Sequence, residues 1–248
     1  MNENYRHRQL LNLLEERKAL STQDIIRLLD VSPATARRDI TKLNEQGRLK
    51  KVRNGAEVIE KKAYRSQPLA INNSGEKKRI AELAAKLCQD GDSVILTCGS
   101  TMLMLGSRLC GKNVQIMTNF LPLANYLIEH DHNDVVIMGG QYNKNQAIML
   151  SLNTNAEAIY AANIMFTSGK GLTVDGLYKT DMLIANSEQR MLPRVGKLVV
   201  LLDSSKLGKQ AGMLFAELHN IHLLITGKEA DAEIIAALKR QGLNVLLA

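Results

Sequence analysis

Seven short apolar runs, separated by helical or loop stretches, dominate the chain from residue 93 onward. Each has the length of a buried strand, and apolar residues at helical spacing lie between most of them. Strands that alternate with helices indicate an α/β domain with a largely parallel sheet. We therefore predict strands at 93–97, 114–118, 134–138, 164–168, 198–203, 223–226 and 244–247, and helices at 101–109, 121–130, 181–192 and 230–241.

Polar loops follow the first five of these strands, at the sheet edge where parallel α/β proteins bind ligands. The loop at 97–101 opens a helix, whose N–H groups and dipole suit a phosphate. Each loop alone is more often a plain turn. Five at one edge, two of them with a lysine, favour a small anionic ligand. The candidate ligand-binding residues are Cys98, Gly99, Ser100, Thr101, Asn119, Gly139, Gly140, Gly169, Lys170, Gly171 and Lys206.

A short basic helix is expected after Ser32, which is a good N-cap and precedes a proline at a position that tolerates it. Ala36, Ile40 and Leu43 form one apolar face, and Gly47 is placed to end the helix in a left-handed conformation. The opposite face carries basic side chains, as a helix in a DNA major groove does. An ordinary solvated basic helix is the alternative.

Upstream sequence favours the DNA-binding interpretation. An amphipathic helix is expected at 5–17, and a second helix follows a cap at Ser21, with Ile25, Leu28 and Leu29 facing inward. Two helices, a tight turn and a basic helix form the helix-turn-helix plan, here at about 20–39. We further predict a basic hairpin around Asn54-Gly55, with strands at 49–52 and 57–59. The candidate DNA-binding residues are Ser32, Thr35, Arg37, Arg38, Lys42, Lys50, Lys51 and Arg53.

The positive charge is concentrated in the first quarter of the chain. Residues 1–65 hold 15 Lys and Arg against 9 Asp and Glu, so they carry six of the seven net positive charges. This is the distribution expected of an N-terminal nucleic-acid module. The chain is expected to comprise a winged helix-turn-helix domain at 1–58, a linker at 59–75 and an α/β effector domain at 76–248.

Several other classes of protein are disfavoured. The three cysteines form no CxxC pair, and the five histidines have no metal-ligand spacing; His130 and His132 are expected at a solvated helix end. The N-terminus is polar and no run approaches a membrane span. We therefore expect a cytoplasmic protein with no metal, cofactor or membrane partner.

Two parts of the N-terminal region carry a family resemblance. The string SPATARRD at 32–39 with Gly47, followed by RNGA at 53–56, resembles the winged-helix signature of the DeoR family of bacterial repressors. Asn54 replaces the first glycine of the usual wing, and asparagine tolerates unusual turn backbone. The resemblance implies a C-terminal effector domain similar in fold to ribose-5-phosphate isomerase and glucosamine-6-phosphate deaminase.

Longer strings resemble the family members that repress L-ascorbate utilisation: RLKKVRNGAE at 48–57, MGGQYNK at 138–144, MFTSGKGLT at 165–173, GLYKTDM at 176–182 and GKLVV at 196–200. This resemblance implies that the effector is L-ascorbate 6-phosphate and that its binding relieves repression. Thr97 and Cys98 stand where many family members have an acidic and a small residue, which suggests a differently presented ligand.

Two functions from different classes remain at this stage. The first is a repressor that binds double-stranded operator DNA as a homo-oligomer, either a dimer or a tetramer, and responds to a small phosphorylated sugar-like effector. The second is a sugar-phosphate isomerase-like enzyme with a DNA-binding appendage, in which Asp181, Glu188 or Asp203 would be a base. We favour the repressor, with no catalytic residues, because the sequence has no recognisable acid/base constellation.

Overall fold

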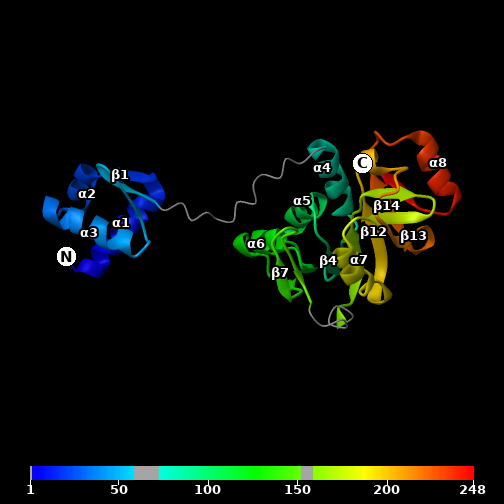
Figure 1. Cartoon of the computed structure of the whole chain (residues 1–248), viewed down its shortest axis with the longest axis horizontal. Helices are drawn as coiled ribbons and strands as arrows, with labels where there is room; N and C mark the ends of the chain where they lie inside the picture. The colour runs from blue at the N-terminus through cyan, green and yellow to red at the C-terminus, as the bar shows by residue number, and fades with distance from the viewer. Residues whose placement is uncertain (1, 59–72, 152–158) are drawn as a thin grey trace. The chain divides into compact units, whose positions relative to one another are not determined.

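The computed structural model describes residues 2–58, 73–151 and 159–248, and the chain divides into two compact units, Met1–Arg65 and Ser66–Ala248. Figure 1 shows the helical N-terminal unit in blue and the larger α/β unit in green to red. Most of the linker expected at 59–75 lies outside the described residues. Its last two residues, Ser74 and Gly75, are helical, because α4 begins at Ser74.

The N-terminal unit is a three-helix core with a small sheet. Its elements are α1 (Glu3–Arg17), β1 (Ala19–Ser21), α2 (Thr22–Leu29), α3 (Pro33–Glu45), β2 (Lys50–Val52) and β3 (Gly55–Glu57). As predicted, Ala36, Ile40 and Leu43 of α3 are buried, where they meet Leu10 and Leu14 of α1. The prediction for Leu28 was wrong: its side chain is 36% exposed, whereas Ile25 and Leu29 on the same helix are buried.

Local side-chain bonds fix both ends of the helix-turn-helix. Ser21 caps α2 by accepting from the N–H of Asp24 at 3.0 Å, and Ser32 caps α3 by accepting from the N–H of Thr35 at 3.2 Å. Asp30 takes a left-handed conformation (φ 49°) between the helices, and Gly47 does so after α3 (φ 65°). The caps and the Gly47 conformation confirm the sequence predictions.

The wing is a three-stranded antiparallel sheet in the order β1-β3-β2, and the sequence did not predict β1. Gly55 was expected in the turn but lies within β3, opposite Ser21 on one side and Val52 on the other. A Cβ atom there would lie 2.0 Å from the carbonyl oxygen of Leu20, so the close approach of β1 requires glycine. Ile59, the last residue of the predicted second wing strand, lies outside the described residues.

The C-terminal unit contains the seven predicted parallel strands, in the order β15-β14-β12-β9-β4-β5-β6. Their bounds lie within a few residues of the predicted ones, with the largest difference at the start of the fifth. They are β4 (Ser93–Leu96), β5 (Gln115–Thr118), β6 (Val135–Ile137), β9 (Ala162–Thr167), β12 (Val195–Leu201), β14 (Leu223–Thr226) and β15 (Val245–Leu247).

The helices of this unit are α4 (Ser74–Ala84), α5 (Ser100–Leu109), α6 (Leu121–Glu129), α7 (Met182–Gln189) and α8 (Ala232–Arg240). Leu87 and Cys88 follow the end of α4 and pack against the core. The predicted helix at 181–192 ends early, and a 3-10 turn, η2 (Leu192–Arg194), follows.

Alternate residues of the central strands enter two separate apolar cores. Val94 and Leu96 pack on one face of the sheet with residues of α4, α5 and α6, whereas Ile95 packs on the other with residues of α8. Parallel strands covered on both faces are apolar along their whole length, which is why the sequence shows them as continuous runs.

A two-stranded hairpin and a three-stranded sheet that the sequence did not predict lie outside the large sheet. A hairpin is formed by β7 (Gln141–Asn143) and β8 (Ile148–Leu150). A second antiparallel sheet is formed by β10 (Gly171–Thr173), β11 (Gly176–Lys179) and β13 (Met213–Glu217). The chain also has the 3-10 turns η3 (Ser204–Lys206) and η4 (Leu218–Asn220). Among the described helices, none is both long and apolar enough to cross a bilayer.

Candidate nucleic-acid interface and effector site

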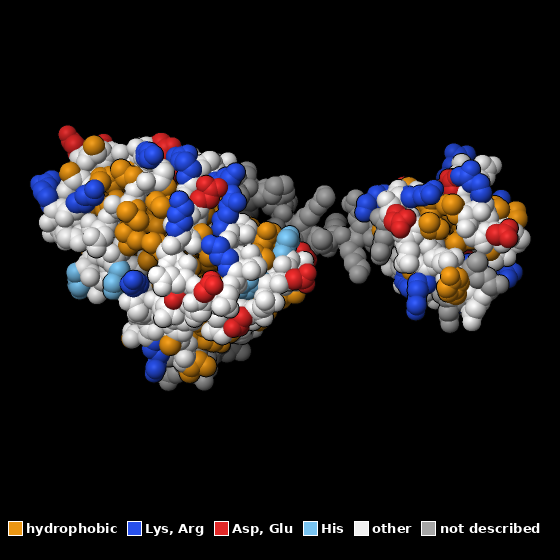
Figure 2. Space-filling view, turned by 180° about the vertical axis from the view of Figure 1, so that it is seen from behind, with side chains coloured by type: hydrophobic (Ala, Val, Ile, Leu, Met, Phe, Trp, Pro, Cys, Tyr) orange, Lys and Arg blue, Asp and Glu red, His pale blue; other side chains and the backbone are white. Residues whose placement is uncertain are grey.

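The free face of α3 carries the side chains that the sequence assigned to DNA. Ser32, Arg37, Arg38 and Lys42 are exposed, and Thr35 is half-buried with its hydroxyl 2.9 Å from that of Ser32. Within the described ranges, neither Arg37 nor Arg38 is ion-paired. Figure 2 shows Lys and Arg side chains at several points around this unit. The guanidinium groups of α3 can therefore meet phosphates or base edges without first breaking an internal ion pair.

A buried ionic cluster, which the sequence analysis missed, ties α3 to α1. Asp39 is 3% exposed; it accepts from Arg6 at 2.5 and 3.0 Å and lies 2.9 Å from the ring nitrogen Nε2 of His7. Burial acts to raise the pKa of Asp39, but the hydrogen bonds from Arg6 and His7 outweigh it and the pKa is lowered. The pair of arginines on α3 is thus presented by a helix whose inner side is fixed by charge as well as by apolar packing.

The other basic candidates are partly engaged within the unit. Lys42 donates to Glu3 at 2.5 Å and Lys50 donates to Glu57 at 3.2 Å, both on the surface. Lys51 donates from its ammonium to Thr41, and Asn44 accepts from its backbone N–H at 2.8 Å, so the wing is joined to α3. Surface pairs of this kind are weak and exchange easily for a phosphate.

The predicted ligand loops lie at the carboxyl ends of the large sheet, as their sequence positions required. The loop after β4 leads into α5, whose N-cap is Gly99 (φ 123°) with no side-chain hydrogen bond to the cap. Neither Ser100 nor Thr101 serves as the cap, because both belong to the first turn of the helix. The first N–H groups of α5 thus lack a side-chain acceptor at the cap, which is the arrangement that accepts an anion.

Two lysines from different segments lie near a buried carboxylate, and a third interacts with one of them. Asp203 is 2% exposed, and its Oδ2 lies 3.2 Å from the ammonium of Lys206 and 3.9 Å from that of Lys77. Lys77 of α4 also interacts electrostatically with Lys170, which follows β9. Burial lowers the pKa of Lys77; Asp203 opposes this, and Lys206 and Lys170 add to it. The structure therefore places both Lys170 and Lys206 within electrostatic reach of Lys77, whose helical spacing gave no signal.

The start of α4 is bonded to the same loop. Glu76 accepts from the N–H of Ser204 at 2.7 Å and from the N–H of Gly227 at 3.1 Å, and Asn73 donates to Asp203 at 3.1 Å. Burial acts to raise the pKa of Asp203, but hydrogen bonding from Ser205 and the charge of Lys206 outweigh it and the pKa is lowered. The first described residues after the connector are thus coupled to a predicted ligand loop.

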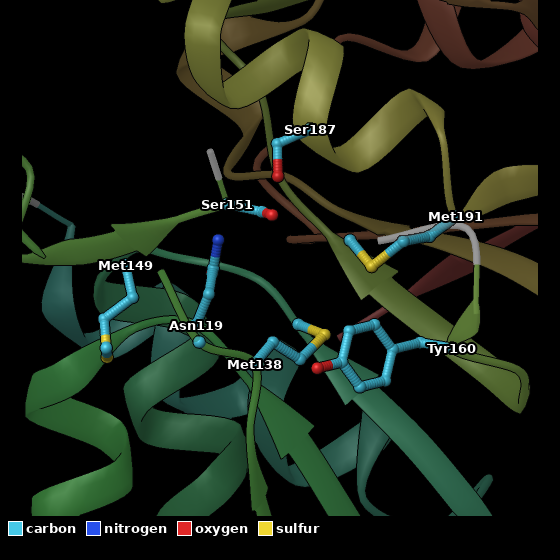
Figure 3. A pocket seen from close by; sticks show the side chains of 8 residues that line it. Asn119, Met138, Met149, Ser151, Tyr160, Ser187 and Met191 are labelled. Carbon is cyan, nitrogen blue, oxygen red and sulfur yellow. The ribbon is translucent and has the colours of Figure 1, made fainter. Parts of the chain in front are cut away.

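A small pocket brings together two more predicted residues. Asn119, which follows β5, and Gly139, which follows β6, line it with Ser151, Tyr160 and Ser187. Figure 3 shows the Asn119 amide and the hydroxyls of Ser151 and Ser187 pointing toward one another, with Tyr160 and three methionines around them. The pocket is small, with a cavity volume of about 20 Å³, and its converging polar groups are of the kind that orient a ligand.

Two predicted glycines have a structural explanation. Gly171 is buried at the start of β10, and a Cβ atom there would lie 2.0 Å from the carbonyl oxygen of Lys209. At Gly140 (φ 153°) a Cβ atom would lie 1.9 Å from the carbonyl oxygen of Leu150. Both positions need glycine for close backbone packing, whether or not a ligand lies nearby.

A second buried ion pair lies at the carboxyl edge, and none of its members was among the predicted ligand-binding residues. Lys179 of β11 donates to Glu188 of α7 at 2.5 Å and to Thr167, the last residue of β9, at 2.7 Å. The Thr167 hydroxyl also donates to Glu188 at 2.8 Å, and Thr97 donates to Thr167 at 3.2 Å. The Lys179 ammonium lies 4.4 Å from the centre of the Phe215 ring. From the sequence, Glu188 was expected only as a possible catalytic base of the alternative, enzymatic function.

The cysteine of the first loop is adjacent to this pair. Burial, and after it the charge of Glu188, raises the pKa of the Cys98 thiol to about 12. Cys98 is therefore a protonated thiol and a poor nucleophile. Its electrostatic interaction with Glu188 and Lys179 places the ion pair beside the loop that leads to Gly99.

The histidine at 132 is not solvated, contrary to our expectation. It is 7% exposed; its Nδ1 accepts from the N–H of Gly111 at 3.1 Å, and its Nε2 lies 2.9 Å from the carbonyl oxygen of Val114. This histidine joins the end of α6 to the residues that precede β5. In the described part of the chain, no group of three or more His, Cys, Asp or Glu side chains could hold a metal ion.

Both halves of the chain match models of known families. The DeoR-like helix-turn-helix domain matches residues 6–62, and the DeoR C terminal sensor domain matches residues 72–228. The HTH-type transcriptional regulators UlaR of Salmonella arizonae and Escherichia coli K12 are each 54% identical to the chain over 249 aligned residues, which cover 99% of both sequences. Among solved structures, a ribose 5-phosphate isomerase A from Methanocaldococcus jannaschii is 20% identical over 53% of each chain, with a TM-score of 0.38.

Proposed function

The chain belongs to the DeoR family of DNA-binding transcriptional regulators, and we propose that it represses L-ascorbate utilisation genes until a phosphorylated sugar-like effector releases it. Its relatives over the full length are regulators rather than isomerases. The observation that carries the proposal is the exposed face of α3, where Arg37 and Arg38 project from a helix-turn-helix whose opposite face is buried.

For DNA binding, we assign direct contact with base edges or nearby phosphates to Thr35, Arg37 and Arg38. Ser32 fixes the start of the recognition helix through its cap bond to Thr35. Lys42, Lys50, Lys51 and Arg53 contact phosphates, which adds affinity and salt dependence without sequence preference. The exposure of these basic side chains supports the assignment.

For the effector, we propose L-ascorbate 6-phosphate, on the strength of the resemblance to repressors of L-ascorbate utilisation. Its phosphate would meet the first turn of α5 and the lysines around Asp203, Lys170 and Lys206 among them. The uncapped start of α5 supports an anion there, and so do Lys206 and Lys170, both of which interact electrostatically with Lys77. Asn119 and Gly139 would add contacts to the ligand from the small pocket that they line.

The start of α4 offers a route from the ligand to the DNA-binding unit. Asn73 and Glu76 are bonded to the loop that contains Asp203 and Lys206, and the connector to the N-terminal unit ends directly before Asn73. An effector that rearranges this loop would change the bonding of the first turn of α4. We further propose a homo-oligomer, a dimer or a tetramer, because helix-turn-helix proteins read paired half-sites through symmetric assemblies.

Fluorescence anisotropy tests the DNA-binding part of the proposal. Labelled DNA from the promoter region of the protein's own gene would be titrated with the full-length chain at 50, 100 and 200 mM salt, beside unrelated DNA of equal length. We expect the promoter fragment to bind more tightly than the unrelated fragment at every salt concentration. Equal affinity for the two fragments would contradict a sequence-specific repressor.

A further inference from the structure

The ion pair of Lys179 and Glu188 lies where the large sheet reverses its strand order. In the sheet, β5 and β6 follow on one side of β4. The later strands β9, β12, β14 and β15 follow on its other side. Thr97 follows β4 and Thr167 ends β9, so their hydrogen bond spans this reversal point at its carboxyl edge. Ligands of open parallel sheets bind in the crevice at this point.

Stability alone does not account for the pair. Lys179 is 7% exposed and Glu188 is 2% exposed, so both charges are largely removed from water. The desolvation cost of such a pair commonly equals or exceeds its mutual attraction, and apolar residues of similar size often serve a fold equally well. A buried pair in a ligand crevice is therefore better explained by a binding role than by the packing of α7.

The bonding of the pair leaves groups that a ligand can use. Both hydrogen bonds to the Glu188 carboxylate go to Oε2, and no donor in the described ranges reaches Oε1. In the described residues, the fully enclosed side-chain atoms without a hydrogen-bond partner are Oδ2 of Asp203 and Oγ1 of Thr226, and Oε1 of Glu188 is not among them. Of the three N–H groups of the Lys179 ammonium, two have oxygen acceptors among the described residues, Thr167 and Glu188, and the ammonium also lies 4.4 Å from the centre of the Phe215 ring.

These groups match one kind of ligand chemistry. A carboxylate oxygen accepts a hydrogen bond from a hydroxyl, and an adjacent ammonium stabilises a negative or strongly polarised oxygen on the neighbouring carbon. We propose that Glu188 and Lys179 form the subsite that binds the non-phosphate end of the effector, by holding two oxygens on adjacent carbons, as in an enediol. This inference rests on the proposed effector function. It assigns protein groups to the end of the ligand that the phosphate-binding residues do not contact.

The subsite is within reach of the proposed phosphate site. Thr97 is bonded to Thr167, and only two residues separate it from Ser100, the first residue of α5. Three residue steps span at most about 11 Å. A sugar phosphate can therefore meet the first turn of α5 at one end and the ion pair at the other. The electrostatic interaction between Cys98 and Glu188 agrees with this spacing.

Calorimetry on the full-length protein tests the subsite with a thermodynamic cycle. The two ligands are L-ascorbate 6-phosphate and its 2,3-di-O-methyl derivative, which keeps the phosphate but lacks the enediol hydroxyls. The proteins are the wild type, Glu188→Gln, and the double variant Lys179→Met with Glu188→Gln. The double variant serves if Glu188→Gln fails to fold, because it leaves no buried lysine without its carboxylate. Glu82→Gln, in the exposed pair with Arg108, is the matched control.

We expect the wild type and Glu82→Gln to bind the parent ester about tenfold more tightly than the methylated one. Folded Glu188→Gln should lose part of this discrimination, because the carboxylate acceptor is gone while the Lys179 ammonium remains, and the double variant should bind both ligands with the same affinity. Undiminished discrimination in either folded variant would overturn the subsite, and so would a wild type that binds neither ester. Ligand binding that fails to release operator DNA would overturn the proposed function but leave the subsite intact.

Discussion

The recognition face of α3 and the carboxyl edge of the large sheet use charge in opposite ways. On α3 the arginines are exposed and free of ion pairs within the described residues, whereas at the sheet edge Lys77, Lys179, Glu188 and Asp203 are buried and bonded. Water screens the first set, which makes its contacts exchangeable and salt-dependent. Burial strengthens the second set and fixes its geometry, as selection of one small ligand requires.

The comparison has an exception in the N-terminal unit itself. The Arg6, His7 and Asp39 cluster is buried like the sheet-edge groups, yet it lies directly beneath an exposed DNA-binding face. Its role is therefore to hold α3 in place for the arginines above it. Substitution of a buried charge that positions α3 should therefore lower stability, whereas substitution of an exposed charge that contacts DNA should lower only DNA affinity.

The largest effect is expected for Asp39→Asn. This change removes the buried carboxylate that Arg6 and His7 share and should lower the free energy of unfolding of the N-terminal unit by about 3 kcal/mol. Hydrogen exchange of the amides in α1 and α3 would measure it. Asp24→Asn, in an exposed pair with Arg27, is the matched control and should leave those amides unchanged. Equal effects of the two changes would remove the distinction between buried and exposed charge.

The same cluster predicts a pH dependence. The pKa of Asp39 is lowered in the folded protein, so its stabilisation is present above the unfolded value of about 3.9 and is lost as the pH falls through the lower folded value. Acid unfolding of the wild type below about pH 4 should thus be steeper than that of Asp39→Asn. Thermal melts between pH 3 and pH 7 would compare the two; parallel curves would contradict the assignment.

The next largest effect is expected for Arg38→Ala on DNA. Loss of a guanidinium that contacts a base edge should weaken operator binding by about thirtyfold and leave the melting temperature unchanged, because the side chain is exposed. Arg240→Ala, an exposed arginine on α8, is the control. Anisotropy would measure both variants, and an Arg38→Ala protein with wild-type operator affinity would remove α3 from the interface.

A change at the sheet edge should spare DNA binding altogether. Lys206→Met removes a cation from the Asp203 group and should weaken binding of L-ascorbate 6-phosphate by about tenfold, while operator affinity without ligand stays the same. Lys239→Met, on the exposed face of α8, controls for the loss of one positive charge. Calorimetry and anisotropy on the same samples would check both halves, and unaltered ligand affinity would exclude Lys206 from the site.

The smallest effect is expected for Lys50→Ala in the wing. Lys50 pairs with Glu57 at the surface and should contribute one phosphate contact. Its loss should reduce the slope of log affinity against log salt by about 0.9 and weaken promoter and unrelated DNA equally. Binding at four salt concentrations would measure the slope. A loss confined to promoter DNA would instead make Lys50 a base-reading residue.

Sequence patterns were sufficient for the features that depend on local periodicity. Seven apolar runs predicted the seven parallel strands, and the caps at Ser21 and Ser32 placed both helices of the helix-turn-helix. The antiparallel strands β10, β11 and β13 escaped prediction because they are only three to five residues long, and because β11 pairs with β13, which lies more than thirty residues further along the chain. Gly55 was misplaced because the constraint on it comes from β1, which lies more than thirty residues away.

Buried charge was the other feature that sequence did not reveal. Asp39, Lys77 and Lys179 look like ordinary surface residues in a pattern analysis, because their partners come from separate segments. The loop residues that were predicted, such as Asn119 and Lys206, stand directly after strands, where the parallel topology itself dictates their place. The sequence therefore indicates the sheet edge at which a ligand is expected, but it does not reveal the buried charged side chains at that edge.

The central claim is that one ligand at the sheet edge controls a DNA contact made by the other unit. The most direct test is the anisotropy of the promoter complex at fixed salt, titrated with L-ascorbate 6-phosphate and, in parallel, with ribose 5-phosphate. We predict that the ascorbate ester releases the DNA and that ribose 5-phosphate at the same concentrations does not. A promoter complex that withstands saturating L-ascorbate 6-phosphate would contradict the account.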